Sequence, residues 1–449
     1  MDYKKLFSDD VPSFMKSPVR EIFRVVDLSS IYSFAGGYPD ASTFPIEDIK
    51  RLSSLVLEKY GTRALQYGAT QGIPELREQI ARRYGVSADN VLITTSSQQG
   101  IDVSSRIMLN PGDTVLTTAP TYLGALQSFK SYRANVVTLD QFAGSEAEQE
   151  EIPQGTCHPR PAPKGKLSLG GQQGDSFPAC RGTASAVGSK EVSNFCEPAK
   201  ISDSFDSPGV SLPAGASLPK FCYIIPDFQN PSGETMTLEE RQRLVDLARK
   251  WDFAIVEDSP YRDLRYSGEP VPTIYSLAPE RTLHLGSFSK IFAPGFRLGW
   301  IIGPPEFLEQ IYICKQCLDL CPPIFNQYLA AEFIAGGAME KNLARSIGLY
   351  REKRDLMLSL LEKYMPEGVS WTHPEGGLFL FLTLPEHIDT VALYDRALKA
   401  GVAYVAGSFF YPDGSHRNTM RLNFSYLDSS RMEPGIKILA EIIGSRVQN

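Results

Sequence analysis

Five short apolar runs in this chain are each followed by side chains that could do chemistry. Lys290 follows the run at 282–285, and Asp258 follows the run at 253–256. The other polar side chains that come after these runs are Ser97, Gln98, Tyr122, Asn230, Tyr261, Ser287, Ser289 and Arg297. This set holds one amine, one carboxylate, one guanidinium, two phenols, two amides and several hydroxyls. It is typical of a polar site that binds an anion and uses a single amine.

The elements that must position these side chains follow an alternating pattern. We predict buried strands at 91–95, 114–118, 221–225, 253–256 and 282–285. Thr237-Leu-Glu-Glu240 has the pattern of a capping box and predicts the start of a helix between two of the strands. Strands that alternate with helices indicate a parallel sheet covered on both faces. Ligands of such sheets bind beyond the carboxyl ends of the strands, where the polar side chains stand.

Pyridoxal phosphate is a cofactor that uses all of these groups. Its aldehyde forms a Schiff base with a lysine, and its pyridine nitrogen pairs with a carboxylate that keeps the ring electron-withdrawing. Its phosphate favours hydroxyls, a cation and a helix N-terminus. Its flat ring favours an aromatic neighbour. The sequence therefore predicts a pyridoxal phosphate site.

The motifs around these residues resemble those of a known family. The segments concerned are 36–39, 67–77, 226–233, 287–300, 375–379 and 421–424. They resemble fold-type I, class I/II aminotransferases, and among these the 2-aminoadipate and kynurenine aminotransferase branch. The resemblance covers nearly all of 1–140 and 220–449. It implies an α/β fold, with a mostly parallel sheet flanked by helices in a large domain and a smaller α+β C-terminal domain.

The resemblance also implies a role for each site residue. Lys290 would bind the cofactor and carry the proton, Asp258 would pair with the pyridine nitrogen, and Tyr122 would stack on the ring. Asn230 and Tyr261 would hold the ring hydroxyl oxygen. The phosphate would be held by Ser97, Gln98, Ser287, Ser289 and Arg297, together with Tyr67 of a second subunit. A homodimer with shared active sites is therefore expected.

Substrate binding is assigned in the same way. Arg421 would clamp the α-carboxylate in a bidentate fork, a geometry that lysine does not offer. Asn230 would also touch the substrate. Gly37 and Arg20 would approach the substrate from the N-terminal arm. The arm is expected at 1–40, the large domain at 41–305 and the small domain at 306–449.

One stretch does not have the composition of a folded domain. Residues 141–219 hold 10 Gly, 9 Pro and 11 Ser in 79 positions, and only 13 Leu, Ile, Val or Phe. Such a composition favours a disordered insert within the large domain. In the family that the chain resembles, a crossover that includes helix joins two strands of the sheet at this place. Here the insert stands in its position. A catalytically impaired homologue is therefore one alternative to an active enzyme.

Charge and cysteine content narrow the class of protein further. The formal net charge is −7 and the pI is about 5.5, which argues against a nucleic-acid or anionic-membrane partner. The N-terminus lacks the apolar core of a secretion signal, and the seven cysteines are sparse and irregularly spaced, so a cytoplasmic protein is expected. Cys314, Cys317 and Cys321 are expected to pack in a helix and not to bind metal. His284 is expected to be a packed residue and not a base.

The expected activity is transfer of an amino group from an L-amino acid of the 2-aminoadipate, aromatic or branched-chain type to a 2-oxo acid such as 2-oxoglutarate. Another enzyme that uses the same cofactor, such as a C–S lyase or a decarboxylase, remains an alternative. A cofactor-sensing transcription regulator carries a similar domain behind a winged helix. It is less favoured, because the motifs begin within the first ~40 residues of this chain.

Overall fold

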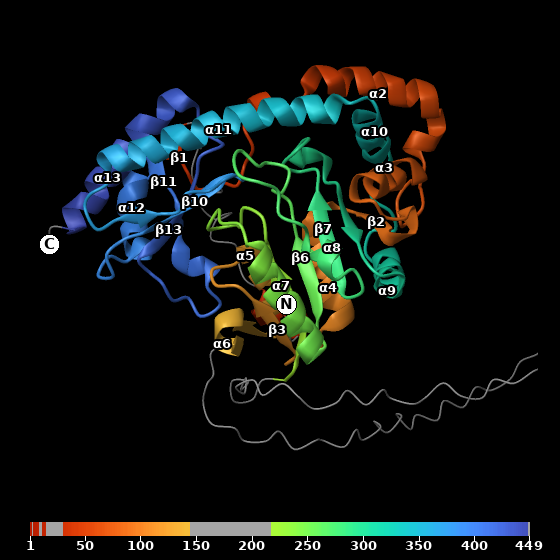
Figure 1. Ribbon diagram of the computed structural model, residues 1–449, viewed down its shortest axis with the longest axis horizontal. Coiled ribbons are helices and arrows are strands. Elements are labelled where there is room, and N and C mark those ends of the chain that lie inside the picture. The colour runs from red at the N-terminus through yellow and green to blue at the C-terminus, as the bar shows by residue number, and fades with distance from the viewer. Residues whose placement is uncertain (2, 9–10, 15–29, 144–216, 448–449) are drawn as a thin grey trace, which may run out of the picture. The chain divides into compact units, whose positions relative to one another are not determined.

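The computed structural model describes residues 1, 3–8, 11–14, 30–143 and 217–447. Its main sheet has seven strands in the order β2-β8-β7-β6-β5-β3-β4 (Figure 1). The strands are β2 (Val91–Thr94), β3 (Thr114–Thr117), β4 (Asn135–Thr138), β5 (Pro219–Ile224), β6 (Ala254–Asp258), β7 (Thr282–Ser287) and β8 (Gly299–Ile302). β8 is antiparallel to both of its neighbours, β2 and β7, whereas the pairings along β7-β6-β5-β3-β4 are all parallel. The predicted mostly parallel sheet is confirmed.

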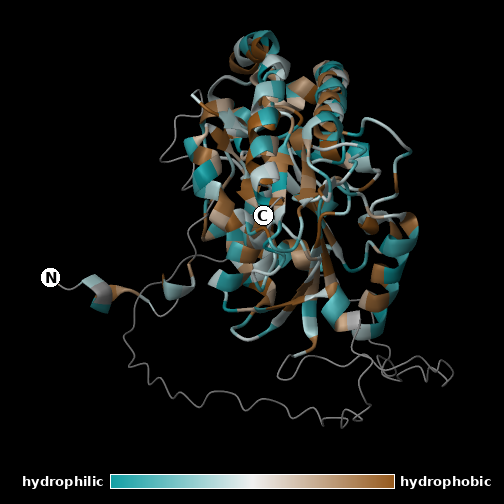
Figure 2. Cartoon of the chain, turned by 90° about the vertical axis from the view of Figure 1, so that its left-hand side faces the viewer, coloured by the Kyte–Doolittle hydropathy of each residue, from teal (hydrophilic) through white to brown (hydrophobic). Residues whose placement is uncertain are grey.

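Helices lie on both sides of this sheet, and Figure 2 shows largely brown strands between helices that carry much of the teal. They are α2 (Ile46–Tyr60), α3 (Pro74–Tyr84), α4 (Ser96–Met108), α5 (Leu123–Ser131), α6 (Leu139–Ala143), α7 (Leu238–Trp251), α8 (Ile274–Leu277), α9 (Pro305–Gln316) and α10 (Ile324–Ala335). The capping box that begins α7 is present: Thr237 Oγ1 accepts from the N–H of Glu240, and the Glu240 carboxylate accepts from the N–H of Thr237. None of the described helices is long and apolar enough to cross a membrane.

A second group of elements forms beside the main sheet. Its antiparallel sheet has the order β12-β13-β10-β9, and a two-stranded parallel sheet joins β1 to β11. The strands are β1 (Tyr32–Ser33), β9 (Ser370–Trp371), β10 (Phe379–Thr383), β11 (Val402–Ala403), β12 (Val405–Ala406) and β13 (Thr419–Asn423). The helices are α11 (Ala338–Tyr364), α12 (Thr390–Lys399) and α13 (Ser429–Val447). Because β1 pairs with β11, the chain near residue 32 belongs to this group.

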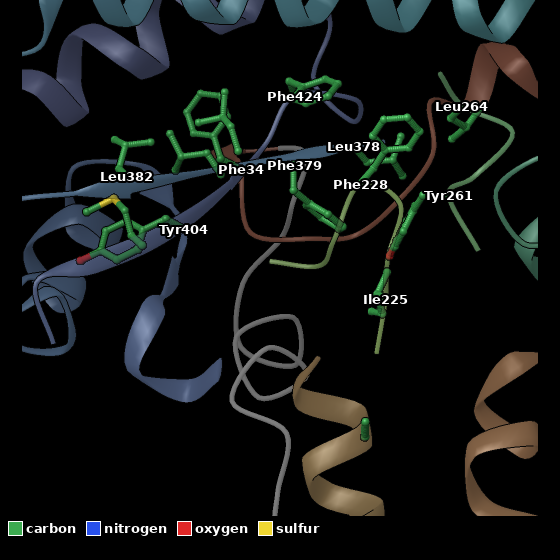
Figure 3. Close-up of a cluster of buried hydrophobic side chains, with 14 of the residues drawn as sticks. Phe34, Ile225, Phe228, Tyr261, Leu264, Leu378, Phe379, Leu382, Tyr404 and Phe424 are labelled. Carbon is green, nitrogen blue, oxygen red and sulfur yellow. The ribbon is translucent and has the colours of Figure 1, made fainter. Parts of the chain in front are cut away.

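The two groups share one continuous apolar core. Buried side chains from the main sheet, from β10 and β13, and from the segment before α2 belong to the same cluster. Figure 3 shows part of it, including Phe34, Phe379, Phe424, Tyr261 and Ile225. Burial of this apolar surface holds the strands that carry the polar site against one another.

The edges of the predicted insert differ from the sequence-based expectation. Residues 141–143 are the last residues of α6, and Pro219 is the first residue of β5. The side chain of Phe142 is fully buried and meets the Trp251 ring edge-on, with ring centroids 5.6 Å apart. This contact packs the end of α6 against the end of α7, at a place where the composition favours loop. Most of the predicted insert, with Cys157, Cys180 and Cys196, lies outside the described residues.

The remaining cysteines and the histidine have the following places. The predicted helix around the cysteines ends at Gln316, so Cys314 lies in α9 while Cys317 caps it and Cys321 follows it. Among the described residues, no group of three or more His, Cys, Asp or Glu side chains is placed to hold a metal ion. His284 is fully buried on β7, with Nδ1 3.0 Å from Oε2 of Glu257. The expectation of a packed histidine is confirmed.

Candidate active site

A cavity of about 1030 Å³ lies at the carboxyl ends of the central strands. Its lining includes most of the side chains that the sequence singled out: Gly37, Ser97, Gln98, Tyr122, Asn230, Asp258, Tyr261, Ser287, Ser289, Lys290, Arg297 and Arg421. These residues come from both groups of elements and span most of the chain. Two predicted site residues are not among them. Tyr67 does not line this cavity and is 78% exposed, and Arg20 lies outside the described residues.

Lys290 stands in the turn that follows β7. Its Nζ donates a hydrogen bond to the carbonyl oxygen of Gly37 at 2.8 Å. Desolvation, together with the charges of Arg421 and Arg297, lowers the pKa of Lys290 to about 8. Close to neutral pH, a useful fraction of this amine is therefore unprotonated and nucleophilic.

Asp258 is the last residue of β6 and is buried. The hydroxyl of Tyr223, on the neighbouring strand β5, donates to its Oδ2 at 2.8 Å. Its Oδ1 is buried without a hydrogen-bond partner in the described part of the chain. Burial raises the pKa of Asp258 to about 7, although the hydrogen bond from Tyr223 acts in the opposite direction. A cationic N–H group would stabilise a buried carboxylate that has one oxygen without a partner, and a protonated pyridine supplies such a group.

The N-terminus of α4 forms an anion-binding end of the cavity. Ser97 and Gln98 lie in its first turn, where backbone N–H groups have no partner within the helix. Ser96, which starts the helix, has a positive φ of 68° and accepts a hydrogen bond from the Arg297 guanidinium at 2.5 Å. Gly299 packs so closely here that a Cβ would lie 2.7 Å from the Ser96 carbonyl carbon. This packing holds the strained turn beside the arginine.

Tyr122 precedes α5, and its ring is held beside α4. Its hydroxyl donates to Oε1 of Gln98 at 3.1 Å. A Cβ on Gly124 would lie only 2.6 Å from the Tyr122 ring, so glycine is required for this position of the ring. Tyr122 lines the cavity together with Gln98 and Asn230, and its aromatic ring is of the type that stacks on a flat ligand.

Arg421 reaches the cavity from β13 and is almost fully buried. It donates to Oδ1 of Asn230 at 2.8 Å and to the carbonyl of Ala35 at 2.5 Å. Its guanidinium carbon lies 4.3 Å from the Phe379 ring centroid and 5.1 Å from that of Phe410. No carboxylate pairs with it in the described structure, and its Nε has no partner there. Burial lowers the pKa of Arg421 to about 10, so a bound carboxylate would supply the missing counter-charge.

Several contributors to the site were not singled out from the sequence. Tyr223 lies within the predicted strand at 221–225 and Ser96 directly precedes Ser97, but neither position marks the side chain as part of the site. Phe379 closes the 375–379 motif, yet nothing in the motif shows that its ring lies against Arg421. The carbonyl of Ala35 leaves no signal in the sequence, because every residue has a carbonyl.

Comparison with known proteins gives the same class of site. The model of the family "Aminotransferase class I and II" matches residues 34–148 and 220–439. Aromatic-amino-acid aminotransferase 1 of Thermococcus litoralis is 40% identical, over 99% of this chain and 95% of the relative. The 2-aminoadipate transaminase of Thermus thermophilus is 31% identical, over 99% and 98%.

Solved structures agree with these relatives. Kynurenine aminotransferase of Pyrococcus horikoshii, in complex with PMP, has a TM-score of 0.80 and 37% identity, over 100% of this chain and 99% of that one. LysN of Thermus thermophilus, an α-aminoadipate aminotransferase complexed with N-(5'-phosphopyridoxyl)-L-leucine, has a TM-score of 0.78 and 29% identity, over the whole of both chains.

The fold and the site thus define a fold-type I enzyme that uses pyridoxal phosphate. Within that class, the chain belongs to the class I and II aminotransferases and is an aminotransferase. Three features of the described residues fit the cofactor with a bound amino acid: Oδ1 of Asp258 without a hydrogen-bond partner, the Arg421 guanidinium without a carboxylate partner, and the N-terminus of α4. The predictions of family, fold, activity and cofactor are confirmed.

Proposed function

We propose that this aminotransferase takes its amino group from a large apolar or aromatic L-amino acid and transfers it to a 2-oxo acid such as 2-oxoglutarate. The observation that carries this proposal is the make-up of the cavity wall. The cationic side chains of the described lining are Lys290, Arg297 and Arg421. The same lining presents Tyr38, Leu123, Leu318 and Phe410. In this proposal Lys290 holds the cofactor, Arg297 binds its phosphate and Arg421 binds the substrate α-carboxylate. No cationic side chain of the described lining is then left for the donor side chain, so an apolar donor side chain fits the remaining wall.

A second candidate donor is 2-aminoadipate, which the Thermus relative's name carries. Its distal carboxylate would need a further cation. Arg20 was expected near the substrate and lies outside the described residues. If Arg20 reached the cavity, it could pair with the distal carboxylate and would favour 2-aminoadipate as the donor.

For the reaction, we propose that Lys290 would hold the cofactor covalently through its amine. When bound, pyridoxal phosphate supplies an aldehyde for the incoming amine and a ring that withdraws electrons from Cα. Lys290 Nζ would take the proton from the substrate Cα as a general base and would then return it to the reactant as a general acid. Asp258 would keep a positive charge on the ring nitrogen, and Tyr122 would orient the ring from one side.

The remaining roles concern orientation. We propose that Ser97, Gln98, Ser287, Ser289 and Arg297 hold the phosphate. Tyr261 interacts with Asn230, and these two side chains would hold the ring hydroxyl oxygen. Arg421 would bind the α-carboxylate, with Asn230 and Gly37 beside the substrate. Fixing both ends of the reactant in this way lowers the entropic cost of reaching the reactive geometry.

We also propose a homodimer in which Tyr67 reaches the phosphate of the partner's cofactor. This is supported by the exposure of Tyr67 and of Leu65, which is 71% exposed. Such apolar side chains side by side are typical of an interface. We also propose that the chain is divided into an arm (1–40), a large domain (41–305) and a small domain (306–449). We propose a cytoplasmic location for the enzyme.

The test is a panel of amino donors with 2-oxoglutarate. We expect kcat/KM for phenylalanine, tyrosine or kynurenine to exceed that for 2-aminoadipate, and leucine to fall between them. A preference for 2-aminoadipate would overturn the proposed donor class. Release of pyruvate and ammonia from a cysteine conjugate, without formation of glutamate, would instead indicate a C–S lyase. Lys290→Ala should abolish transamination with every donor.

A further inference from the structure

Residues 34–43, called here the N-terminal strap, bring two backbone carbonyls into the active site. The carbonyl of Ala35 accepts a hydrogen bond from Arg421 at 2.5 Å, and that of Gly37 accepts from Lys290 Nζ at 2.8 Å. Tyr38, next along the strap, lines the cavity. The position of the strap therefore decides where two functional side chains point.

A buried lysine far along the chain holds this strap. Lys353, on α11, has a side chain that is 2% exposed. Its ammonium group donates to the Asp40 carboxylate, to the carbonyl of Ser425 at 2.8 Å and to the carbonyl of Leu427 at 2.8 Å. All three hydrogens of the ammonium group thus have an acceptor. Burial favours the neutral form of Asp40, but the contacts with Lys353 and Ser42 hold its pKa below the ordinary value.

The same face of α11 makes further polar contacts with the strap. The hydroxyl of Tyr350 accepts from the Asp40 N–H at 3.0 Å, and Arg345 donates to the Thr43 carbonyl at 3.0 Å. Asn342, farther along this face, donates to the carbonyl of Ile291, the residue after Lys290, at 3.3 Å. A helix of a globular protein normally buries an apolar stripe, so the buried polar groups of Asn342, Tyr350 and Lys353 on this face point to a specific role.

Lys353 also touches the segment that carries Arg421. Ser425 and Leu427 follow β13 directly, and the Ser425 hydroxyl donates to the Tyr38 carbonyl at 2.8 Å. Figure 1 shows α11 crossing from the side of α2 and α10 to the side of α13. One ammonium group thus joins the strap to the strand of the carboxylate-binding arginine.

We infer that Lys353 is a positioning residue for substrate binding, which acts through Asp40 and the Ser425–Leu427 turn to set the strap against Arg421. The inference rests on the proposed role of Arg421 in binding the substrate carboxylate. Buried ion pairs add little net stability compared with apolar packing, yet they can specify one arrangement of the chain. Without the pair, the strap loses one of its links to the segment that follows β13, while the hydrogen bonds of Ser425 to Tyr38 and of Asn423 to Phe34 remain. The Ala35 carbonyl is then held less firmly against Arg421.

The test uses Lys353→Met and Asp40→Asn, with Lys363→Met as matched control. Lys363 lies on the same helix, but its side chain is 62% exposed and its ion pair with Glu433 is at the surface. We expect KM for the amino donor to rise about tenfold or more in both test variants, with kcat changed less than about threefold. The affinity for pyridoxal phosphate should stay within about twofold, because the phosphate and ring contacts are elsewhere. Amide hydrogen exchange of residues 34–40 should become faster in both test variants.

Each other outcome contradicts the inference. Lower thermal stability with an unchanged KM would show a purely structural role for Lys353. If Lys353→Met does not fold, the KM of Asp40→Asn tests the inference. Asparagine keeps the shape of the side chain and can still accept the hydrogen bond from the Ser42 N–H. Failure of the proposed function looks different: the unaltered enzyme and Lys363→Met would then transaminate no donor. In that case, unchanged exchange of the strap in Lys353→Met would still overturn the inference.

Discussion

Tyr223 and Asp258 form a buried pair on neighbouring strands, in which the phenol donates to Oδ2 of the carboxylate at 2.8 Å. Tyr223 lies on β5 and is fully buried, and the Phe129 ring packs edge-on against it with centroids 5.6 Å apart. The phenol occupies one carboxylate oxygen, while Oδ1 has no hydrogen-bond partner in the described structure. Under the proposed function, Oδ1 is therefore the oxygen that would pair with the cofactor nitrogen.

Tyr223→Phe should reduce kcat without unfolding the protein. The substitution keeps the ring but removes a hydrogen bond to a charged group, which is worth about 1.5–3 kcal/mol. The pKa of Asp258 should rise further, so the positive charge on the cofactor nitrogen is held less firmly. We expect kcat to fall about 10- to 100-fold, and the pH titration of the cofactor absorbance to shift. Wild-type kcat and an unshifted titration would contradict this role.

Asp258→Asn should stabilise the cofactor-free protein while it abolishes transamination. The folded-state pKa of Asp258 is about 7, above its ordinary value of 3.8. A raised carboxyl pKa means that stability from this group is present at low pH and is lost as pH rises from about 4 to 7. At pH 8, removal of the buried charge should add about 1–3 kcal/mol to the free energy of unfolding. Urea melts of both cofactor-free proteins test this, and equal stability at pH 8 would contradict it.

Attachment of pyridoxal phosphate to the cofactor-free enzyme should accelerate as pH rises, with a midpoint near pH 8. Lys290 has a lowered pKa of about 8, so the reactive free amine dominates above that value. The folded state binds fewer protons than the unfolded state between pH 8 and 10.5, so this group's contribution to stability increases across that range. Stopped-flow absorbance gives the attachment rate. A midpoint near 10.5 would show an ordinary lysine instead.

Gly124→Ala should impair the enzyme through Tyr122. The added methyl group would meet the Tyr122 ring at 2.6 Å, closer than real contacts allow, so the ring must turn away. We expect affinity for pyridoxal phosphate to fall about tenfold, the equivalent of ~1.4 kcal/mol. Gly348→Ala is a suitable control, because a methyl group there meets no atom within 4 Å. Equal affinity in both variants would exclude a role for the Tyr122 ring position.

Asp227→Ala should be among the most destabilising substitutions. Asp227 is buried, pairs with the fully buried Arg241 at 2.8 Å, and accepts from Arg262 at 2.9 Å. Removal of one partner from such a pair leaves an uncompensated buried charge and costs about 3–5 kcal/mol. The exposed pair of Arg243 and Glu239 is the contrast, and Glu239→Ala should change stability by less than about 0.5 kcal/mol. Similar denaturation midpoints for both variants would contradict the argument.

The sequence by itself was sufficient for the class of fold and for most of the cavity wall. Apolar runs that end in polar residues predict strands of a parallel sheet, and the topology of such a sheet brings their carboxyl ends to one edge. Asp258, Ser287 and Asn230 follow that rule, so a local pattern placed them correctly. The capping box at Thr237 is also local, and the structure confirms it.

Only the tertiary structure decided which groups meet across the fold. Arg421 and the Ala35 carbonyl are separated by 386 positions, and Lys353 and Asp40 by 313. These contacts depend on the packing of α11 and β13 against the segment before α2, which no local pattern encodes. The last residues of the short helix α6 lie in a stretch of loop-like composition, and there Phe142 packs against Trp251. Periodicity and motif spacing describe the neighbours of a residue along the chain. The role of a backbone carbonyl or of a buried ion pair depends instead on tertiary packing, which brings distant segments into contact.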